Sequence, residues 1–318
     1  MLRTLIAAVA AVSLQTGGAL AQDDYPNKPV TMVVGFSAGG GMDTLGRLVA
    51  ERLGEELGQQ VVVENRPGAG GTIAPGYVAT ANADGYTLYL GETAAMIAPA
   101  VIGDVAYDPL GSFVPVAQLA VAPLALVANN DVPASNMQEF VDLLKSKPDE
   151  YFYASSGVGT LQHLAGEKLK NDAGIEMEVV HFQGGAPSVK AVISGEVAFG
   201  ITSLNAASAQ AEGGNLKVLG VTTLDPVPGF EDIDTISSVA DGFDAAPRQF
   251  IMAPAETPQA VLDKLGTAIE ASMQDEQLRA DLSSRGLVPT YLTAQELGDQ
   301  LPQVIETWSE VAGTALAN

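Results

Sequence analysis

The sequence predicts an α/β protein built from two lobes, with the second lobe inserted into the first and a ligand cleft between them. Three observations lead to this prediction. Strand and helix patterns alternate along the chain, which is typical of βαβ units with a parallel sheet. Three strands end in a glycine-rich turn that opens a helix. The chain has 318 residues, enough for about two domains of roughly 150 residues each.

The first 21 residues have the features of a secretory signal peptide. Arg3 precedes the apolar run Leu5–Leu14, and Ala19-Leu20-Ala21 matches a small-residue cleavage pattern. The apolar run is shorter than the roughly 20 residues that a membrane span needs. We therefore expect residues 1–21 to be removed before Gln22 and the mature protein to be periplasmic.

Composition argues against several classes of protein. Cysteine is absent, so disulfides, thiolate metal sites and a cysteine nucleophile are not available. Export without disulfides suits a large bacterial periplasmic protein with an adequate core. The formal charge of −23 argues against nucleic-acid binding, which needs a basic face. Salt screens surface charge within about 10 Å, so the net charge does not decide the ligand.

The first third of the chain predicts a βαβαβ unit. Strands are expected at Val30–Phe36, Val61–Glu64 and Tyr86–Leu90. The helix after the first strand carries Leu45, Leu48, Val49, Leu53 and Leu57 on one apolar stripe. A second helix is expected to run to about Ala81. These elements predict a parallel sheet in the first lobe.

The middle of the chain repeats this order, and its tail is helical. Strands are expected at Leu124–Ala128, Tyr151–Ala154, Val179–Phe182, Ala198–Ile201, Leu216–Thr222 and Gln249–Ala253. Helices are expected at Met137–Ser146, after Thr160, and at Pro258–Met273, Glu276–Ser284 and Ala294–Ala312. We expect residues 22–124 and 249–318 to form the first lobe and residues 125–248 to form the second. The chain would cross between the lobes near Leu124 and Gln249.

The glycine-rich turns at Ser37–Gly41, Gly68–Gly71 and Ser155–Thr160 have the features of an anion site. Each precedes a helix whose first amides lack an intrahelical partner and whose dipole adds partial positive charge. Glycine also lets a ligand approach the backbone. A single turn of this kind often only connects two elements, but three of them favour convergence on a cleft. None has the complete G-x-G-x-x-G or G-x-x-x-x-G-K-[ST] pattern of a nucleotide site.

A periplasmic serine hydrolase is an alternative from another class. Gly35-Phe36-Ser37-Ala38-Gly39 matches G-x-S-x-G and lies between a predicted strand and helix, as a nucleophile elbow should. Such an enzyme would need His163 or His181 beside Ser37, and nothing in the sequence marks that partnership. Neither histidine has the spacing of a zinc site, so we expect no metal and no cofactor.

Several motifs resemble the substrate-binding proteins of tripartite tricarboxylate transporters, also called the Bug family. The most specific stretch is Val63-Glu64-Asn65-Arg66-Pro67-Gly68-Ala69-Gly70-Gly71. Further matches are Gly39–Asp43, Asp84–Leu88, His163–Glu167 and Ala253–Pro258, and they run in order through nearly the whole mature chain. The resemblance implies a fold like the type II periplasmic binding proteins, whose two lobes close on a ligand.

The resemblance also implies a function without catalysis. The ligand would be a small carboxylate, either a di- or tricarboxylate or an aromatic acid. A monomeric receptor would deliver it to a membrane permease with one large and one small subunit. A ligand sensor that signals to a membrane kinase is a further alternative.

The family's site residues can be carried over by position. In the first lobe they are Phe36, Ser37, Ala38, Gly39 and Gly40 with Gly68, Ala69 and Gly70, and in the second lobe Ser155, Ser156, Gly157 and Thr160. Asp43 would cap the first helix, order the loop, or meet a hydroxyl or ammonium group of the ligand. His163 would support the second-lobe loop, and Trp308 would lie in the core.

Two positions depart from the family pattern. Where the family often has an aromatic residue before the returning strand, this chain has Arg248, and where an Asp is common it has Thr202. Arginine binds carboxylates in a bidentate manner. We therefore hypothesise that Arg248 reaches the cleft and holds a second carboxylate. A surface position at the hinge is the alternative for this residue.

Overall fold

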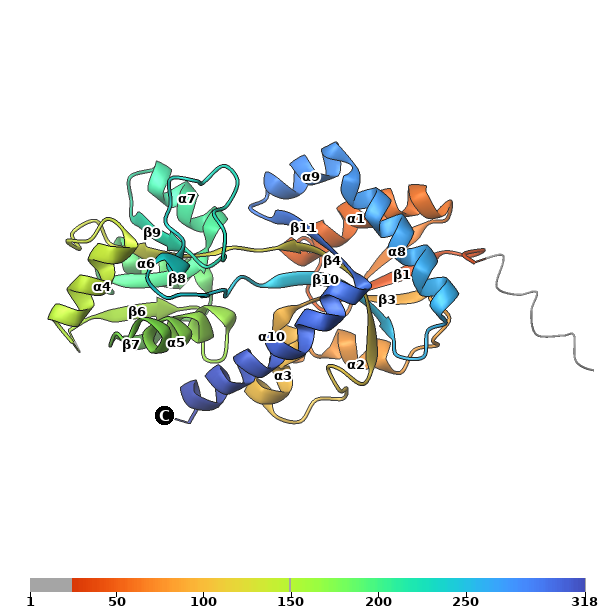
Figure 1. Ribbon diagram of the computed structural model, residues 1–318, viewed down its shortest axis with the longest axis horizontal. Helices are drawn as coiled ribbons and strands as arrows, with labels where there is room; N and C mark the ends of the chain where they lie inside the picture. The colour runs from red at the N-terminus through yellow and green to blue at the C-terminus, as the bar shows by residue number, and fades with distance from the viewer. Residues whose placement is uncertain (1–24, 149, 318) are drawn as a thin grey trace, which may run out of the picture.

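Two β-sheets lie side by side along the long axis of the protein, each covered by helices (Figure 1). The computed structural model describes residues 25–148 and 150–317, so the predicted signal peptide lies outside the described residues. The first sheet has the strand order β11-β4-β10-β3-β1-β2, and the second has the order β7-β6-β8-β5-β9. The predicted α/β architecture is confirmed.

The first sheet combines parallel and antiparallel strands. Its strands are β1 (Val30–Val34), β2 (Val61–Asn65), β3 (Thr87–Glu92), β4 (Phe113–Val121), β10 (Arg248–Pro254) and β11 (Val288–Thr293). β1, β2 and β3 pair in parallel, as the sequence predicts. β10, β4 and β11 add antiparallel pairs. The sequence does not predict β4 or β11, because Pro115 and Gln118 interrupt the apolar pattern of β4 and β11 is a partly exposed edge strand.

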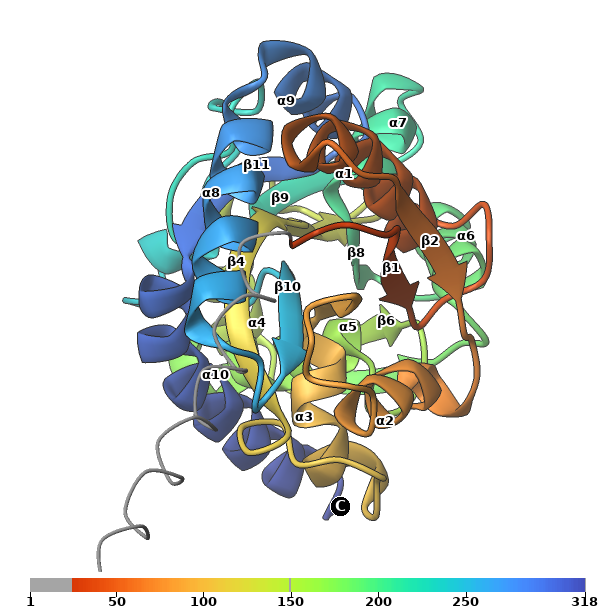
Figure 2. The ribbon, with the colours of Figure 1, turned by 90° about the vertical axis from the view of Figure 1, so that its right-hand side faces the viewer.

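Helices cover both faces of the first sheet (Figure 2). They are α1 (Gly41–Leu57), α2 (Ile73–Ala79), α3 (Thr93–Ile102), α8 (Gln259–Gln274), α9 (Glu276–Ser283) and α10 (Ala294–Ala315). Leu45, Val49 and Leu53 of the predicted α1 stripe pack with α8 and α9 in one core. α2, α3 and the start of α10 enclose a second core on the opposite face.

The second sheet is built from the middle of the chain, largely as predicted. Its strands are β5 (Leu124–Ala128), β6 (Phe152–Ser155), β7 (Glu178–His181), β8 (Phe199–Ser203) and β9 (Lys217–Val221). Its helices are α4 (Met137–Ser146), α5 (Leu161–Ala173), α6 (Gly185–Ile193) and α7 (Leu204–Glu212). α4 and α5 pack on one face, and α6 and α7 pack on the other.

The chain passes between the two sheets at two adjacent connections (Figure 1). One connection leads from β4 to β5, and the other leads into β10. They run side by side, because the Ala122 amide donates a hydrogen bond of 2.8 Å to the Pro247 carbonyl oxygen. The two connections are therefore held together where the chain passes from one sheet to the other.

α10 contributes to the cores of both sheets. Near its start, Leu297 and Leu301 pack in a core of the first sheet. Near its end, Trp308 and Ala312 pack in a core of the second sheet. Trp308 is buried, as the sequence predicts. Figure 1 shows α10 running from the first sheet toward α5, which packs on the second sheet. This helix therefore contacts elements of both sheets.

Candidate ligand-binding site

A cavity of about 460 Å³ lies at the N-terminal end of α1, and elements of both sheets line it. The first sheet and its helices, which we call the first half of the protein, contribute Gly39–Met42, Glu92 from the end of β3, and Gln249 from β10. The second sheet and its helices, the second half, contribute Asn205 from the start of α7. Arg285, which follows α9, also lines the cavity. A cavity of this size is typical of small-molecule sites, which occupy about 300–1,000 Å³. We call it the α1 cavity.

The glycine turn before α1 presents backbone amides to this cavity. Gly39 has a φ of 83°, a conformation that glycine adopts without strain. Gly40 is the N-cap of α1, and no side chain caps the helix. The Gly40 amide donates to the Ser37 carbonyl oxygen, and the first intrahelical bond is made by the Thr44 amide. Helical geometry therefore leaves the amides of Gly41, Met42 and Asp43 without an intrahelical partner, and of these residues Gly41 and Met42 line the cavity.

Asp43 orders this turn. Its Oδ2 accepts hydrogen bonds from the Gly39 amide at 2.8 Å and from Arg47 Nε at 2.9 Å. Arg47 Nη2 also lies 2.9 Å from Asp43 Oδ1. The bond from Arg47, followed by that from the Gly39 amide, lowers the pKa of Asp43 to about 2. This arrangement fits the loop-ordering role among the alternatives, and it occupies the Gly39 amide.

The second glycine turn is tied to the first by Asn65. Its Nδ2 donates to the Phe36 carbonyl oxygen at 3.0 Å. Gly68 and Gly70 have φ values of 133° and 66°, which explains why glycine is required there. A Cβ at Gly70 would lie 3.1 Å from Cδ1 of Ile102. This turn therefore lies beside the C-terminal end of α3.

The loop Ser155–Thr160 of the second sheet satisfies most of its own polar groups. The buried Ser155 Oγ lies 2.7 Å from His181 Nδ1. Ser156 Oγ donates to Thr160 Oγ1 at 3.3 Å, and Thr160 Oγ1 donates to the Gly157 carbonyl oxygen at 2.8 Å. In this conformation the three hydroxyl groups stabilise the loop, and the loop does not line the α1 cavity.

His163 supports the same loop, as expected. The Gly159 amide donates to His163 Nδ1 at 3.1 Å, and His163 is almost completely buried. Gly159 lies so close to Val101 of α3 that a Cβ would collide with that side chain. The Ser155–Thr160 loop and the Gly68–Gly70 turn thus lie beside the C-terminal end of α3, whereas the α1 cavity lies at its start.

Arg248 and Gln249 point to opposite sides of β10, as successive strand residues do. Arg248 Nη2 lies 2.9 Å from Asp244 Oδ2, and Arg248 Nη1 donates to Gln300 Oε1 at 2.6 Å. Arg248 lines a separate cavity of about 380 Å³ that includes Gln118. Arg248 therefore does not line the α1 cavity, and the hypothesis that it holds a second carboxylate of the ligand stays a prediction. The side chain at the α1 cavity is Gln249.

Thr202 also lies away from the α1 cavity. It belongs to β8, pairs with Ala125 and is 5% exposed. Ser203 is the N-cap of α7, where its side chain accepts from the Ala206 amide. Asn205, in the first turn of α7, is the residue of this segment that lines the α1 cavity.

Sequence reasoning missed Glu92, Gln249 and Arg285 as cavity residues. Glu92 is partly buried, and burial raises its pKa to about 7. Gln249 is 2% exposed, and its Oε1 has no hydrogen-bond partner among the described residues. Two of these residues carried a signal in the sequence. Glu92 is a polar residue at the end of an apolar strand, and Gln249 is a polar residue at the start of one.

The structure offers no partner for a nucleophilic Ser37 among the described residues. Ser37 is exposed on the α1 turn, whereas His181 bonds to Ser155 and His163 to the Gly159 amide. Within residues 25–148 and 150–317, no group of three His, Asp or Glu side chains is placed to hold a metal ion. Over the same ranges, no helix combines the length and apolar character needed to cross a membrane.

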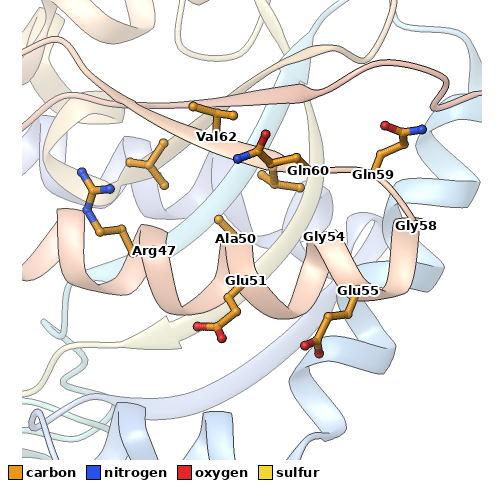
Figure 3. Close-up of a pocket in the computed structure, with 11 residues that line it drawn as sticks. Arg47, Ala50, Glu51, Gly54, Glu55, Gly58, Gln59, Gln60 and Val62 are labelled. Atoms are coloured by element: carbon orange, nitrogen blue, oxygen red, sulfur yellow. The ribbon is translucent and has the colours of Figure 1, made fainter.

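A larger cavity of about 650 Å³ lies on the outside of the first sheet, between α1 and β2 (Figure 3). Arg47, Ala50 and Gln60 line it together with neighbouring residues of the same two elements. The side chains of Glu51 and Glu55 point away from β2 in Figure 3. Only the first half of the protein contributes to this cavity, so closure of two lobes cannot enclose a ligand there. The α1 cavity is the better candidate.

Comparison with known proteins identifies the family of this chain. The sequence profile described as the tripartite tricarboxylate transporter family receptor, TctC, matches residues 45–312. A UPF0065 protein of Bordetella bronchiseptica is 37% identical over 274 residues, which cover 86% of this chain and 81% of that protein.

Two similar solved structures contain a ligand. R. palustris Rpa4515 with adipate has 32% identity and a TM-score of 0.75, covering 92% of this chain and 98% of that chain. MatC from Rhodopseudomonas palustris with bound malate has 28% identity and a TM-score of 0.70, covering 91% of this chain and 100% of that chain. Adipate and malate are both small dicarboxylates.

Proposed function

This chain belongs to the tripartite tricarboxylate transporter family of receptors, and on that premise we propose that it is a periplasmic solute-binding protein for a small dicarboxylate. Such a protein captures its ligand without chemical change. The ligand class is proposed from the adipate and malate in the names of two similar structures. A tricarboxylate or an aromatic acid would satisfy the same amide donors, so the experiment below includes both.

The α1 cavity is the observation that carries this proposal. The Gly41 and Met42 amides lie at the uncapped end of α1, where helix geometry concentrates partial positive charge. A carboxylate there needs no cationic side chain. Asp43 stays ionised but is compensated by Arg47 and the Gly39 amide. Its charge therefore opposes an anionic ligand less than a free carboxylate would.

Closure of two lobes would complete the site. We propose residues 22–124 with 249–318 as the first lobe and residues 125–248 as the second. The paired connections at Ala122 and Pro247 would act as the hinge. Asn205 at the α1 cavity supports this arrangement. The Ser155–Thr160 loop, on the same side of the protein as α3, would approach the ligand on closure.

Location and partner follow from the same proposal. We propose that residues 1–21 are cleaved before Gln22 and that the mature protein is a periplasmic monomer. It would deliver its ligand to a permease with one large and one small membrane subunit. The family description as a transporter receptor supports this partnership.

A thermal-shift and calorimetric screen tests the function. Adipate, malate, citrate and benzoate are the probes, and a ligand that binds the folded state raises the midpoint of thermal unfolding. Gly41→Glu places a negative charge at the cavity, and a Cβ at Gly41 meets no atom within 4 Å. We expect this variant to fold and to bind the best carboxylate at least about tenfold more weakly, a loss of about 1.4 kcal/mol.

Gly313→Glu is the matched control. Gly313 is exposed on α10, its Cβ position is also open, and it does not line the α1 cavity. This variant should bind as the wild type does. Absence of a shift with every carboxylate would contradict the proposed function. Equal binding by Gly41→Glu and the wild type would show that the ligand binds at a site other than the α1 cavity.

A further inference from the structure

Glu92 and Gln249 face each other across two neighbouring strands at the wall of the α1 cavity. β10 pairs with β3 in an antiparallel register that sets Gln249 opposite Glu92. Cross-strand partners project to the same face of a sheet, and both residues line the cavity. The wall therefore presents a carboxyl group beside a carboxamide.

Neither side chain is fully satisfied by the described part of the protein. Gln249 is 2% exposed, and its Oε1 has no partner among the described residues. Glu92 is the N-cap residue of α3, but its side chain accepts no capping hydrogen bond. Buried polar groups almost always have partners, and an unpaired one destabilises the folded state. The unpaired Gln249 Oε1 and the partly buried Glu92 carboxyl group therefore give the α1 cavity a polar wall that the described residues leave open.

Few charges surround Glu92. Arg285 is the other charged residue at the cavity, and its Nη1 donates to the Asp281 carbonyl oxygen at 2.8 Å. On α1, Asp43 is already bonded to Arg47.

The remaining neighbours are uncharged. On β3 itself, burial keeps the pKa of Tyr89 well above its usual value, so its hydroxyl group is neutral. Gln249 and Asn205 face the cavity from β10 and α7, and Arg248 points to the other side of β10. Desolvation raises the pKa of Glu92 to about 7.

We propose that Glu92 binds the ligand in its protonated form, donating a hydrogen bond to a ligand carboxylate oxygen, so that ligand binding takes up a proton. The proposal rests on the proposed function, because it requires an anionic ligand in the α1 cavity. An ionised Glu92 would repel a carboxylate held at the α1 amides, whereas a neutral carboxylic acid acts as a donor toward it. Gln249 can present its amide nitrogen to the same ligand.

This arrangement also sets specificity. A ligand with an ammonium group beside its carboxylate would favour an ionised Glu92. A dicarboxylate without an ammonium group favours the protonated form. Glu92 thus selects plain dicarboxylates over amino acids, and it makes affinity increase as the pH falls toward about 6.5, below the pKa of this residue.

Isothermal titration calorimetry of adipate between about pH 6.5 and 8.5 tests the proposal. The carboxyl groups of the ligand have an ordinary pKa of about 4, so they stay ionised in this pH range. Titrations in two buffers of different ionisation enthalpy give the number of protons taken up. For the wild type we expect uptake approaching about one proton per adipate near pH 8 and a Kd that rises by up to about tenfold per pH unit.

Glu92→Gln keeps the shape of the side chain and a hydrogen-bond donor but cannot titrate. We expect it to bind adipate near the lower end of this pH range about as well as the wild type, with no proton uptake and a flat pH profile. Glu56→Gln, an exposed change on α1, should behave as the wild type. Thermal unfolding of each variant verifies that it folds.

Three results would overturn the inference. The first is adipate binding by the wild type without proton uptake, which leaves the proposed function intact. The second is an unchanged pH profile in Glu92→Gln. The third is loss of adipate binding by this folded variant at every pH, which would mean that a neutral amide donor cannot replace the Glu92 side chain. If no carboxylate binds the wild type at any pH, the proposed function fails and this inference fails with it.

Discussion

Asp43 and Arg47 determine which amides of the first glycine turn remain for a ligand. The Gly39 amide is bonded to Asp43, and the Gly40 amide is bonded within the turn. The family resemblance places the ligand at Phe36 to Gly40, and this stays a prediction; of the amides that line the α1 cavity, those of Gly41 and Met42 have no partner in the turn. The motif cannot show which amides remain for a ligand, because this depends on which ones the protein uses for itself.

Asp43→Asn tests this role. We expect the free energy of unfolding at pH 7 to fall by about 1–2 kcal/mol, because a charged hydrogen bond and an ion pair are replaced by neutral contacts. The carboxyl pKa is lowered from 3.8 to about 2. The stabilisation from Asp43 is therefore fully present above about pH 4 and is lost as the pH falls toward 2. Urea unfolding of both proteins at pH 7 and pH 3 measures the difference.

Asp104→Asn, an exposed change, is the control for Asp43→Asn and should leave stability unchanged. The gap between wild type and Asp43→Asn should narrow at pH 3. Equal stability of the two proteins at pH 7 would contradict the ordering role of Asp43.

Residue identity predicts some site positions and not others. Gly68 and Gly70 could be singled out because their left-handed backbone requires glycine. Arg248 and Gln249 could not be told apart, because a shift of one residue in a strand exchanges the two faces. Glu92 was missed because the start of α3 was not predicted, and Pro99 inside that helix weakens its pattern.

Elements with strong local patterns were predictable. β1 to β3 alternate with helices, and α1, α8 and α10 carry long apolar stripes. β4 and β11 were not predictable in the same way. β4 pairs on both sides in the middle of the sheet, and its pairing with β10 includes two register shifts. Its stability comes from tertiary pairing, and a single sequence does not show which distant strands supply it.

The contact between the Ser155–Thr160 loop and α3 can be tested at Gly159. Gly159→Ala introduces a methyl group that collides with Val101, at a residue whose φ is 72°. We expect the free energy of unfolding to fall by about 1–3 kcal/mol. Chemical denaturation of Gly159→Ala, Val101→Ala and the double variant gives the coupling between the two positions.

Gly174→Ala is the matched control for Gly159→Ala. Gly174 has a φ of 59°, but a Cβ there meets no atom within 4 Å, so this variant reports backbone strain alone. The double variant should be more stable than the sum of the two single changes predicts. Strict additivity would show that the loop and α3 do not touch in solution.

At the scale of the whole molecule, α10 links the two halves through their cores. The linear order of strands and helices predicted two α/β lobes. It did not predict that one helix would serve both cores, because an apolar stripe does not specify which sheet it covers. Trp308 is 5% exposed in the core of the second sheet, although α10 follows strands of the first.

Trp308→Ala tests this link. We expect a loss of about 3–5 kcal/mol, because removal of a large buried side chain leaves a cavity. We also expect thermal unfolding to separate into two transitions, with the second sheet unfolding first. Differential scanning calorimetry with far-ultraviolet circular dichroism measures both effects. Trp308→Phe should retain most of the stability and one transition. A single, unshifted transition for Trp308→Ala would contradict the link.

A small change in the length of β10 could alter which side chain lines the α1 cavity during evolution. Arg248 and Gln249 are adjacent, yet they serve two separate cavities. A register shift already lies just after them, between Gln249 and Phe250. The extra residue of this irregularity, Leu119, belongs to β4, whereas deletion of Gln249 from β10 would move Arg248 into its register position and put a guanidinium group at the α1 cavity. Relatives that differ only by such a deletion should therefore differ in the ligands they bind.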